Sequence, residues 1–264
     1  MNEINKQIVN TKEVYSYEKM QNDIRNLKAR YPFIQIENIG ESVLKKQIPC
    51  IKLGKGPNEV MYSASIHANE WITSLVLMKF VEDFCDAYEK NIDIYEHNAG
   101  MIFETSSIYI VPMLNPDGVN LVTGNVKEGT EEYNHYKIIA NNFPNISFPS
   151  GWKANYNGVD LNLQFPADWE KAREIKFAQG FNKPAPRDFV GFGPLTEPEA
   201  LAIYNFTLVH NFRLILAYHT QGEVIYWKYA DFMPIDAEEI GKIFSKVSGY
   251  YLADTPMQSA NAGY

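Results

Sequence analysis

Cysteine is scarce in this sequence, and so is clustered positive charge. Its 264 residues contain only Cys50 and Cys85, which form no metal-binding or redox motif, so we expect two small buried thiols. Lys and Arg number 24 against 32 Asp and Glu, which gives a formal net charge of −8 with no basic run. Nucleic acids and anionic membranes both attract basic patches, so the sequence disfavours either as a partner.

Long apolar runs are also lacking. Nothing approaches the roughly 18 apolar residues that a membrane span needs. Residues 1–6 contain no apolar core of a secretory signal. We therefore expect a soluble, cytoplasmic protein, whose oligomeric state the sequence does not indicate. Its hydrophobic content of 45% and aromatic content of 14% suffice for a sizeable core, which excludes general disorder.

What the sequence does contain is an alternation of strand-like and helix-like segments. Apolar runs predict strands, and apolar residues three or four apart predict helices. The expected helices are 14–31, 70–89, a capped segment from Thr196 to about Val209, and 237–252. The expected strands are 33–39, 48–53, 60–66, 107–114 and 212–218. Asn115–Gly118 reads as a turn, and residues 122–158 and 166–195 read as irregular.

This alternation predicts an α/β fold. We expect one domain over residues 1–264, because no linker divides the chain. Its sheet should be mixed, mostly parallel and twisted, with helices on both faces. In such sheets ligands bind at the ends of the strands.

Two histidines and a glutamate fall at expected strand ends. His67 and Glu70 follow one buried strand, and His219 follows another. Two histidines and one carboxylate with open coordination positions are the ligands of a catalytic zinc. Each motif alone is ambiguous, since His67 could cap a helix and Glu70 could complement the helix dipole. The remaining histidines lack such partners, and we assign them to structure: His97, His135 and His210.

Further motifs follow in a fixed order. They are residues 67–73 (HANEWIT), 115–118 (NPDG), 158–162 (GVDLN), 194–199 (PLTEPE) and His219. In this order they resemble the zinc carboxypeptidase family, from about Tyr15 to the last residue.

The resemblance implies one zinc ion, held by His67, Glu70 and His219. Asp160 matches an acid that hydrogen-bonds the first histidine ligand. Asn162 matches a substrate-binding amide. Lys153 falls where the family often has an arginine that polarises the scissile carbonyl, although a solvated loop lysine is an equal alternative.

One position departs from the family pattern. Where the family's exopeptidases carry an arginine that grips the substrate's terminal carboxylate, this chain has Leu163 and then Gln164. The variant is similar to the branch of γ-D-glutamyl-L-diamino acid endopeptidases, which cut bacterial cell-wall peptides. That resemblance places a peptide or muropeptide substrate near Leu163, Gln164 and the loop residues Thr220, Gln221 and Glu223.

The end of the sequence is a second departure. In the family, the glutamate that activates water lies on a strand after the last helix, beyond a loop with a substrate-binding tyrosine. Here no glutamate follows residue 254, so we expect a truncated fold without its last strand and helix. The tyrosine candidates are Tyr250, Tyr251 and Tyr264.

The sequence thus favours a zinc metallopeptidase that hydrolyses a γ-D-glutamyl–diamino acid bond by means of a zinc-activated water. Three alternatives stay open. The chain could be a catalytically crippled pseudo-peptidase that binds muropeptides, a zinc metallocarboxypeptidase, or an amino-acid deacylase on the same fold. The general base separates the first of these from the others, because losing positioned acid–base catalysis typically costs about 10² to 10⁴-fold in rate.

Overall fold

A five-stranded sheet forms the centre of the computed structural model, which describes residues 7–255. The strand order is β1-β2-β6-β3-β7. The strands are β1 (Gln35–Glu41), β2 (Gln47–Gly54), β3 (Asn58–Ala64), β6 (Ser106–Val111) and β7 (Leu214–Tyr218). A strand was expected in all five segments, three of them (β3, β6 and β7) as buried apolar runs.

The sheet is mixed, as predicted. β2 runs antiparallel to both β1 and β6, whereas β3 runs parallel to both β6 and β7. Four strands therefore point the same way and only β2 is reversed. The carboxyl ends of β3 and β7 consequently lie side by side, with Ala64 opposite Tyr218. His67 and His219 follow these two strand ends in the sequence.

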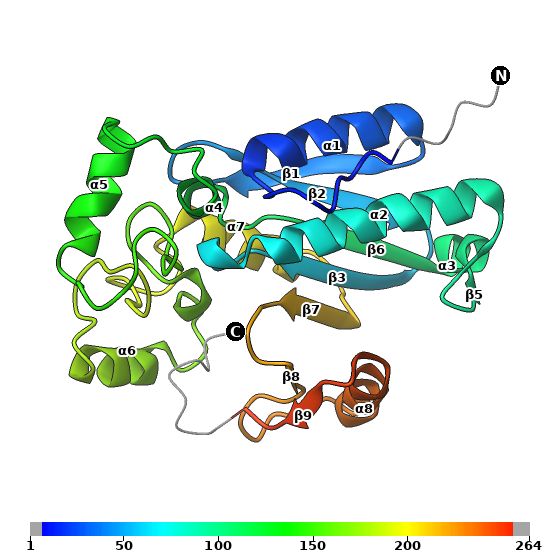
Figure 1. Ribbon diagram of the computed structural model, residues 1–264. Coiled ribbons are helices and arrows are strands. Elements are labelled where there is room, and N and C mark those ends of the chain that lie inside the picture. The colour runs from blue at the N-terminus through cyan, green and yellow to red at the C-terminus, as the bar shows by residue number, and fades with distance from the viewer. Residues whose placement is uncertain (1–6, 256–264) are drawn as a thin grey trace.

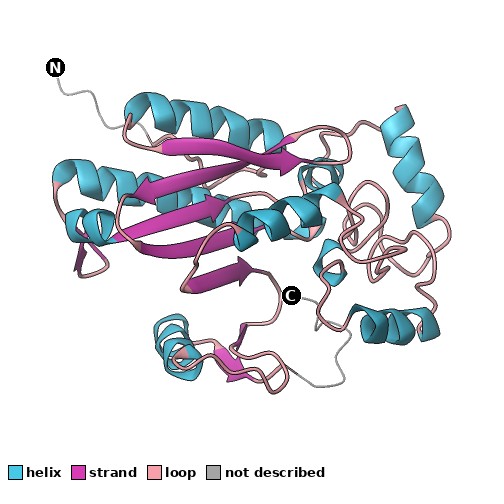
Figure 2. Cartoon of the chain, turned by 180° about the vertical axis from the view of Figure 1, so that it is seen from behind, coloured by secondary structure: helices cyan, strands magenta, loops and turns pink. Residues whose placement is uncertain are grey.

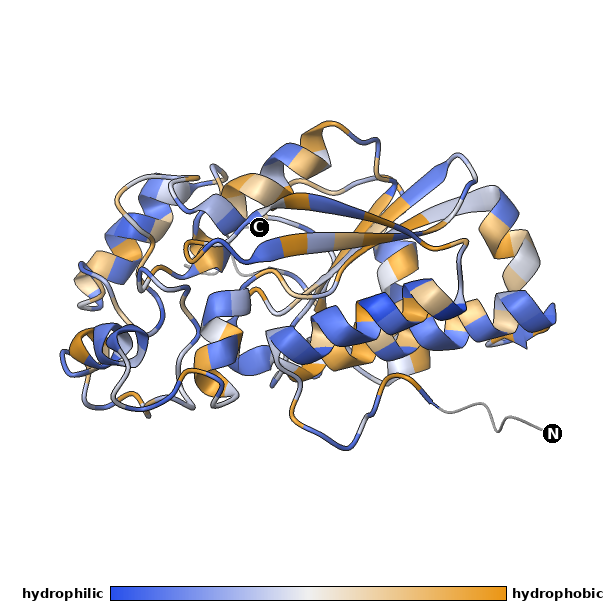
Figure 3. Cartoon of the chain, turned by 90° about the horizontal axis from the view of Figure 1, so that it is seen from above, coloured by the Kyte–Doolittle hydropathy of each residue, from blue (hydrophilic) through white to orange (hydrophobic). Residues whose placement is uncertain are grey.

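Helices cover both faces of the sheet (Figures 1 and 2). On one face, α1 (Tyr17–Arg30) and α2 (Ile72–Lys90) pack in one apolar cluster with Leu53 and Ile110. On the other, α7 (Pro198–Leu208) packs against Cys50 and Tyr109. Side chains alternate across a strand, so neighbouring positions of β2 and β6 serve the two clusters. Figure 3 shows the hydrophobic and hydrophilic residues alternating along these elements.

Smaller elements fill the remaining chain, and several were not foreseen. They are the 3₁₀ turns η1 (Ala68–Glu70) and η2 (Leu161–Leu163), the strand pair β4 (Asp93–Ile94) and β5 (His97–Asn98), and the helices α3 (Ala99–Thr105), α4 (Pro116–Val122), α5 (Glu131–Ala140) and α6 (Trp169–Ala178). The segments expected to be irregular therefore carry α5 and α6, and Figure 1 shows both beyond the carboxyl ends of β3 and β7.

A predicted turn and a predicted helix cap both differ from the expectation. Asn115–Gly118 is not a simple turn, because Asn115 caps α4 by accepting a hydrogen bond from the Gly118 amide, with Pro116 in the first turn. Thr196 does not cap α7, which begins after Glu197 without a side-chain cap. The Thr196 hydroxyl instead donates to the Gln164 and Gly193 oxygens.

The last described segment follows β7 and lies below it in Figure 1. It consists of β8 (Val224–Tyr226), α8 (Ala237–Ser248) and β9 (Tyr251–Ala253), with β8 and β9 paired in parallel. α8 is shorter than expected, because Gly249 ends it in a left-handed conformation. β7 is half exposed rather than buried, with Ile215 45% accessible. Within residues 7–255, none of the helices has the length and apolar character needed to cross a membrane.

Candidate metal centre

A strained turn at the end of β3 positions the first two candidate ligands. The backbone of Ser65 has a φ angle of 48°, which residues other than glycine rarely adopt. Its amide donates to the Thr73 hydroxyl, and its own hydroxyl bonds Ser74 at 2.6 Å. The Thr73 hydroxyl also donates to the Glu70 carbonyl at 2.8 Å. These buried bonds fix η1, and therefore Glu70, to the start of α2.

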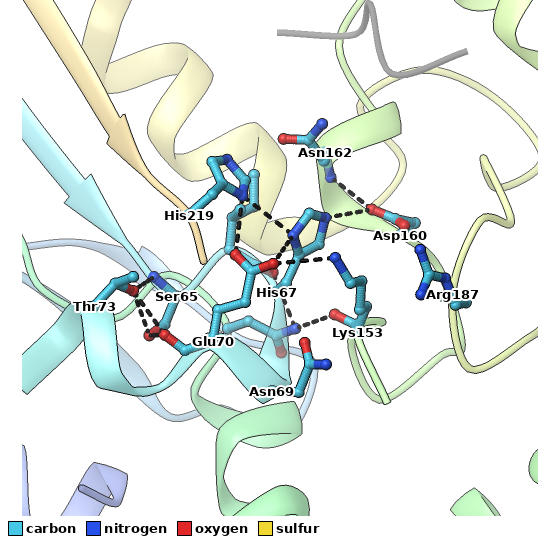
Figure 4. Close-up of polar contacts among 12 residues, drawn as sticks. Ser65, His67, Asn69, Glu70, Thr73, Lys153, Asp160, Asn162, Arg187 and His219 are labelled. Carbon is cyan, nitrogen blue, oxygen red and sulfur yellow. Dashed lines mark hydrogen bonds and ion pairs between the residues drawn. The ribbon is translucent and has the colours of Figure 1, made fainter. Parts of the chain in front are cut away.

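His67, Glu70 and His219 converge on one point (Figure 4), with ligand atoms that all lie within 4.8 Å of one another. The distance from His67 Nδ1 to Glu70 Oε1 is 3.1 Å, and from His219 Nδ1 to Glu70 Oε2 it is 2.9 Å. The two histidine Nδ1 atoms are 3.2 Å apart. Tetrahedral zinc with bonds of about 2.0–2.2 Å separates its ligand atoms by about 3.3–3.6 Å. The three side chains therefore fit a zinc ion with little movement.

The outer nitrogen of His67 is held by Asp160. Oδ1 of Asp160 lies 3.2 Å from His67 Nε2, while Oδ2 accepts the Asp188 amide at 3.0 Å. A carboxylate at Nε2 retains the proton there and leaves Nδ1 as the bare nitrogen. In the neutral ring, Asp160 would therefore direct the lone pair of His67 Nδ1 toward Glu70 and His219.

The two carboxyl groups and His67 shift one another's pKa values in opposite directions. Burial raises the pKa of Asp160, but His67 and the Asp188 amide outweigh it and hold that pKa well below its usual range. Burial likewise raises the pKa of Glu70, while bonds from His219 and His67 lower it further than burial raises it. For His67, burial lowers the pKa, yet Asp160 and Glu70 raise it to about 9. The Glu70 carboxylate is thus ionised at the point where a cation would bind, and the Asp160 carboxylate is ionised behind the His67 ring.

Lys153 reaches the centre from a separate loop. Its Nζ lies 3.0 Å from Glu70 Oε1, and its side chain is only 14% accessible. Its carbonyl accepts from the Ala68 amide and from Nδ2 of Asn115. Nδ2 of Asn115 also donates to Ile66, so it ties the end of β3 to this loop. Lys153 therefore lies at the centre, partly buried and paired with Glu70.

Two amide side chains in the site have unmet hydrogen-bonding capacity. Among residues 7–255, the buried Oδ1 atoms of Asn69 and Asn162 have no partner. Figure 4 shows both side chains around the metal group, and Asn162 is only 4% accessible. Buried amide oxygens usually have partners, so these two atoms are available to a ligand. Asn162 was expected here, whereas Asn69 was not singled out from the sequence.

The structure does not bring the side chains of Leu163 and Gln164 into the site. Leu163 is 2% accessible and packs in a cluster with Trp169 and Val190. Gln164 is fully buried, and its Oε1 accepts from the Thr196 and Glu197 amides. Both residues serve the packing of η2, so the loss of the family's arginine at position 163 leaves no cation there.

The remaining sequence candidates lie along the loop that follows β7 and near α8. Thr220, Gln221 and Glu223 come directly after His219, and Gln221 and Glu223 adopt positive φ angles of 81° and 47°. Gln221 and Glu223 are exposed. Of the tyrosines, Tyr250 lies between α8 and β9, Tyr251 is the first residue of β9, and Tyr264 lies outside the described residues.

Arg187 is the charged residue that the sequence did not reveal. Figure 4 shows it beside Asp160, on the same side of the centre as Lys153. It lies in the segment expected to be irregular, 27 positions after Asp160, and no motif marks it. The Asp188 amide contact with Asp160 brings it to the site.

Comparison with known proteins agrees with this geometry. A family model described as zinc carboxypeptidase matches residues 20–257. A γ-D-glutamyl-L-diamino acid endopeptidase 1 from Lysinibacillus sphaericus is 44% identical over 97% of this chain. The uncharacterised protein YqgT from Bacillus subtilis (strain 168) is 35% identical over 91% of it. The chain spans 63% of the length of each of these two relatives.

Solved structures share the fold. The bovine thrombin-activatable fibrinolysis inhibitor, in complex with tick carboxypeptidase inhibitor, superimposes with a TM-score of 0.66 at 19% sequence identity. The match covers 96% of this chain and 80% of that chain. At such low identity the likeness concerns the fold, and the expected α/β architecture is confirmed.

Proposed function

The chain belongs to the zinc carboxypeptidase family, and from that premise we propose that it carries the zinc site of a peptidase that cleaves γ-D-glutamyl–diamino acid bonds in cell-wall peptides. The zinc ligands would be His67, Glu70 and His219. The observation that carries the metal part is the convergence of their ligand atoms within 4.8 Å. A zinc ion there would polarise the scissile carbonyl and lower the pKa of water.

The residues of this chain have separate tasks in the proposal. Asp160 holds His67 in the tautomer that presents Nδ1 to the metal. Lys153 stabilises negative charge that develops on the carbonyl oxygen, since its ammonium is largely buried beside Glu70. The partnerless Oδ1 of Asn162 accepts a hydrogen bond from a substrate N–H group.

The substrate part rests on two observations. The relative named as a γ-D-glutamyl-L-diamino acid endopeptidase is 44% identical along almost the whole chain. Leu163 is buried against Trp169, so position 163 offers nothing to the terminal carboxylate of an ordinary peptide. Both favour a γ-linked substrate over a standard C-terminal one.

The test compares two peptides. The full-length protein, loaded with zinc, would be incubated with L-Ala-γ-D-Glu-diaminopimelate and with an α-linked tripeptide that has an ordinary C-terminal residue. Mass spectrometry would follow the products. We expect release of diaminopimelate from the first peptide and little cleavage of the second. The reverse preference would overturn the substrate proposal.

A metal-free control separates chemistry from binding. Turnover should disappear after chelation and return with zinc. Binding of the γ-linked peptide without detectable turnover in the zinc-loaded protein would instead identify a muropeptide-binding pseudo-peptidase.

A further inference from the structure

We propose that Arg187 binds a free carboxylate of the substrate and so supplies the anion recognition that position 163 lacks. This inference rests on the proposed function, because it concerns the same site and the same class of peptide. A γ-linked D-glutamyl residue keeps its α-carboxylate free, a few bonds from the scissile carbonyl. An arginine near the scissile bond would pair with that carboxylate.

The backbone fixes Arg187 at that place. On its amino-terminal side, the Pro186 carbonyl accepts from the amides of Lys153 and Ala154 at 2.8 and 2.9 Å. On its carboxyl-terminal side, the Asp188 amide donates to Oδ2 of Asp160 at 3.0 Å. Arg187 is therefore held between the loop of Lys153 and the carboxylate that supports His67. Its position is coupled to the site by bonds on both sides.

The guanidinium has capacity left for a ligand. Its Nε donates to Asp188 Oδ2 at 2.7 Å, a bond that orients the group. The same Asp188 carboxylate also pairs with Lys176, so two cations share one acid. Within residues 7–255 the two terminal NH₂ groups of Arg187 have no hydrogen-bond partner, and the side chain is 43% accessible. An oriented fork with both terminal donors available matches the geometry of a carboxylate.

The neighbouring groups agree with this assignment. Lys153 is paired with Glu70, and Lys176 is almost buried against Asp188, so neither ammonium is exposed to a ligand as Arg187 is. Leu163, where the family's exopeptidases carry their arginine, faces the cluster around Trp169. Among the described residues around Asp160, Arg187 is thus the accessible cation whose terminal NH₂ groups can still donate hydrogen bonds to a ligand.

Paired substrates test the inference through selectivity. Two γ-linked peptides would be used, one with D-glutamate and one with D-isoglutamine, in which an uncharged amide replaces the α-carboxylate. Dissociation constants come from calorimetry and KM from turnover. With Arg187→Gln we expect about 10- to 100-fold weaker binding of the carboxylate peptide, the size of a hydrogen bond to a charged group. The amide peptide should change by less than about threefold.

Two further variants act as controls. Arg187→Lys retains the charge without the fork and should recover part of the lost affinity. Arg213→Gln removes an exposed arginine at the far end of β7, which is paired with Asp236, and should change neither peptide. Equal zinc content in all variants would show that the Asp188–Asp160 link survives.

The outcomes are distinct. An equal loss for both peptides would assign Arg187 a structural role, and no loss for either would remove it from recognition, so each result overturns the inference. In both cases wild-type cleavage of the γ-linked peptide would leave the proposed function standing. If the wild-type protein neither binds nor cleaves either peptide, both proposals fail.

Discussion

Replacing Asp160 with asparagine should weaken zinc binding without removing a ligand. Asp160 accepts a hydrogen bond at each oxygen, from the His67 ring and from the Asp188 amide. Asparagine has only one oxygen. If that oxygen stays on Asp188, its NH₂ group faces His67 Nε2 and favours the tautomer with a proton on Nδ1, the atom that should bind the metal. If that oxygen turns to His67, the NH₂ group faces the Asp188 amide, and two hydrogen-bond donors then point at each other.

Either arrangement carries a cost. Removing such an outer partner typically lowers metal affinity about 10- to 100-fold, or roughly 1.4–2.7 kcal/mol. We expect a loss in that range for Asp160→Asn, measured by competition with a chromogenic chelator at constant pH. Circular dichroism would confirm that the variant is folded.

Asp23→Asn provides the matched control. Asp23, in α1, is another buried carboxylate, 3% accessible, but it accepts a hydrogen bond from the Tyr15 hydroxyl and does not contact the centre. Its replacement should leave zinc affinity unchanged. If Asp160→Asn binds zinc as tightly as the wild type, or if Asp23→Asn weakens zinc equally, Asp160 does not act through His67.

Three further outcomes concern stability and pH. Gly118→Ala should lower the free energy of unfolding by about 1–3 kcal/mol in chemical denaturation, because a Cβ there would lie 2.6 Å from the Ala154 carbonyl; an unchanged value would contradict the close packing of α4 on this loop. Burial, opposed by bonds from Val43 and Asn155, raises the pKa of Glu199 from 4.5 to about 7. The folded state therefore binds this proton more tightly than the unfolded state, and the protein loses stability as the pH rises between those two values. Glu199→Gln should remove that part of the slope, so the variant gains stability relative to the wild type as the pH rises from 5 to 8; parallel curves would refute it. Glu59→Gln should destabilise the protein by about 1 kcal/mol at pH 7 and by less at pH 3, measured by thermal melting at both values. Burial raises the pKa of Glu59, but bonds from Asn211 and His210 lower it by more. The stabilising contribution of these bonds is lost when Glu59 is protonated at low pH.

The sheet could be predicted from the sequence because its strands are apolar runs with clear ends. β3 and β7 each deliver a ligand, and their parallel pairing sets His67 and His219 side by side. Short-range signals were less decisive. Asn115, Pro116 and Gly118 suit both a turn and a helix start, and the long-range bonds of Asn115 to Ile66 and Ala154 fit its place as the cap of α4.

Side-chain direction could not be predicted at η2. Asp160, Asn162, Leu163 and Gln164 are almost adjacent in sequence, yet the first two line the site and the last two enter the surrounding packing. A 3₁₀ turn distributes successive side chains around its axis, and only the neighbouring elements decide which of them face the metal. Arg187 escaped prediction for a related reason, since a backbone contact between distant segments places it.

A crystal of the zinc-loaded protein, measured on both sides of the zinc absorption edge, tests the central claim most directly. The account predicts one anomalous peak within about 2.0–2.2 Å of His67 Nδ1, a Glu70 carboxylate oxygen and His219 Nδ1. It also predicts that Asp160 remains hydrogen-bonded to His67 Nε2. A peak elsewhere, or bonding through His67 Nε2, would contradict the assignment of these three residues as the metal centre.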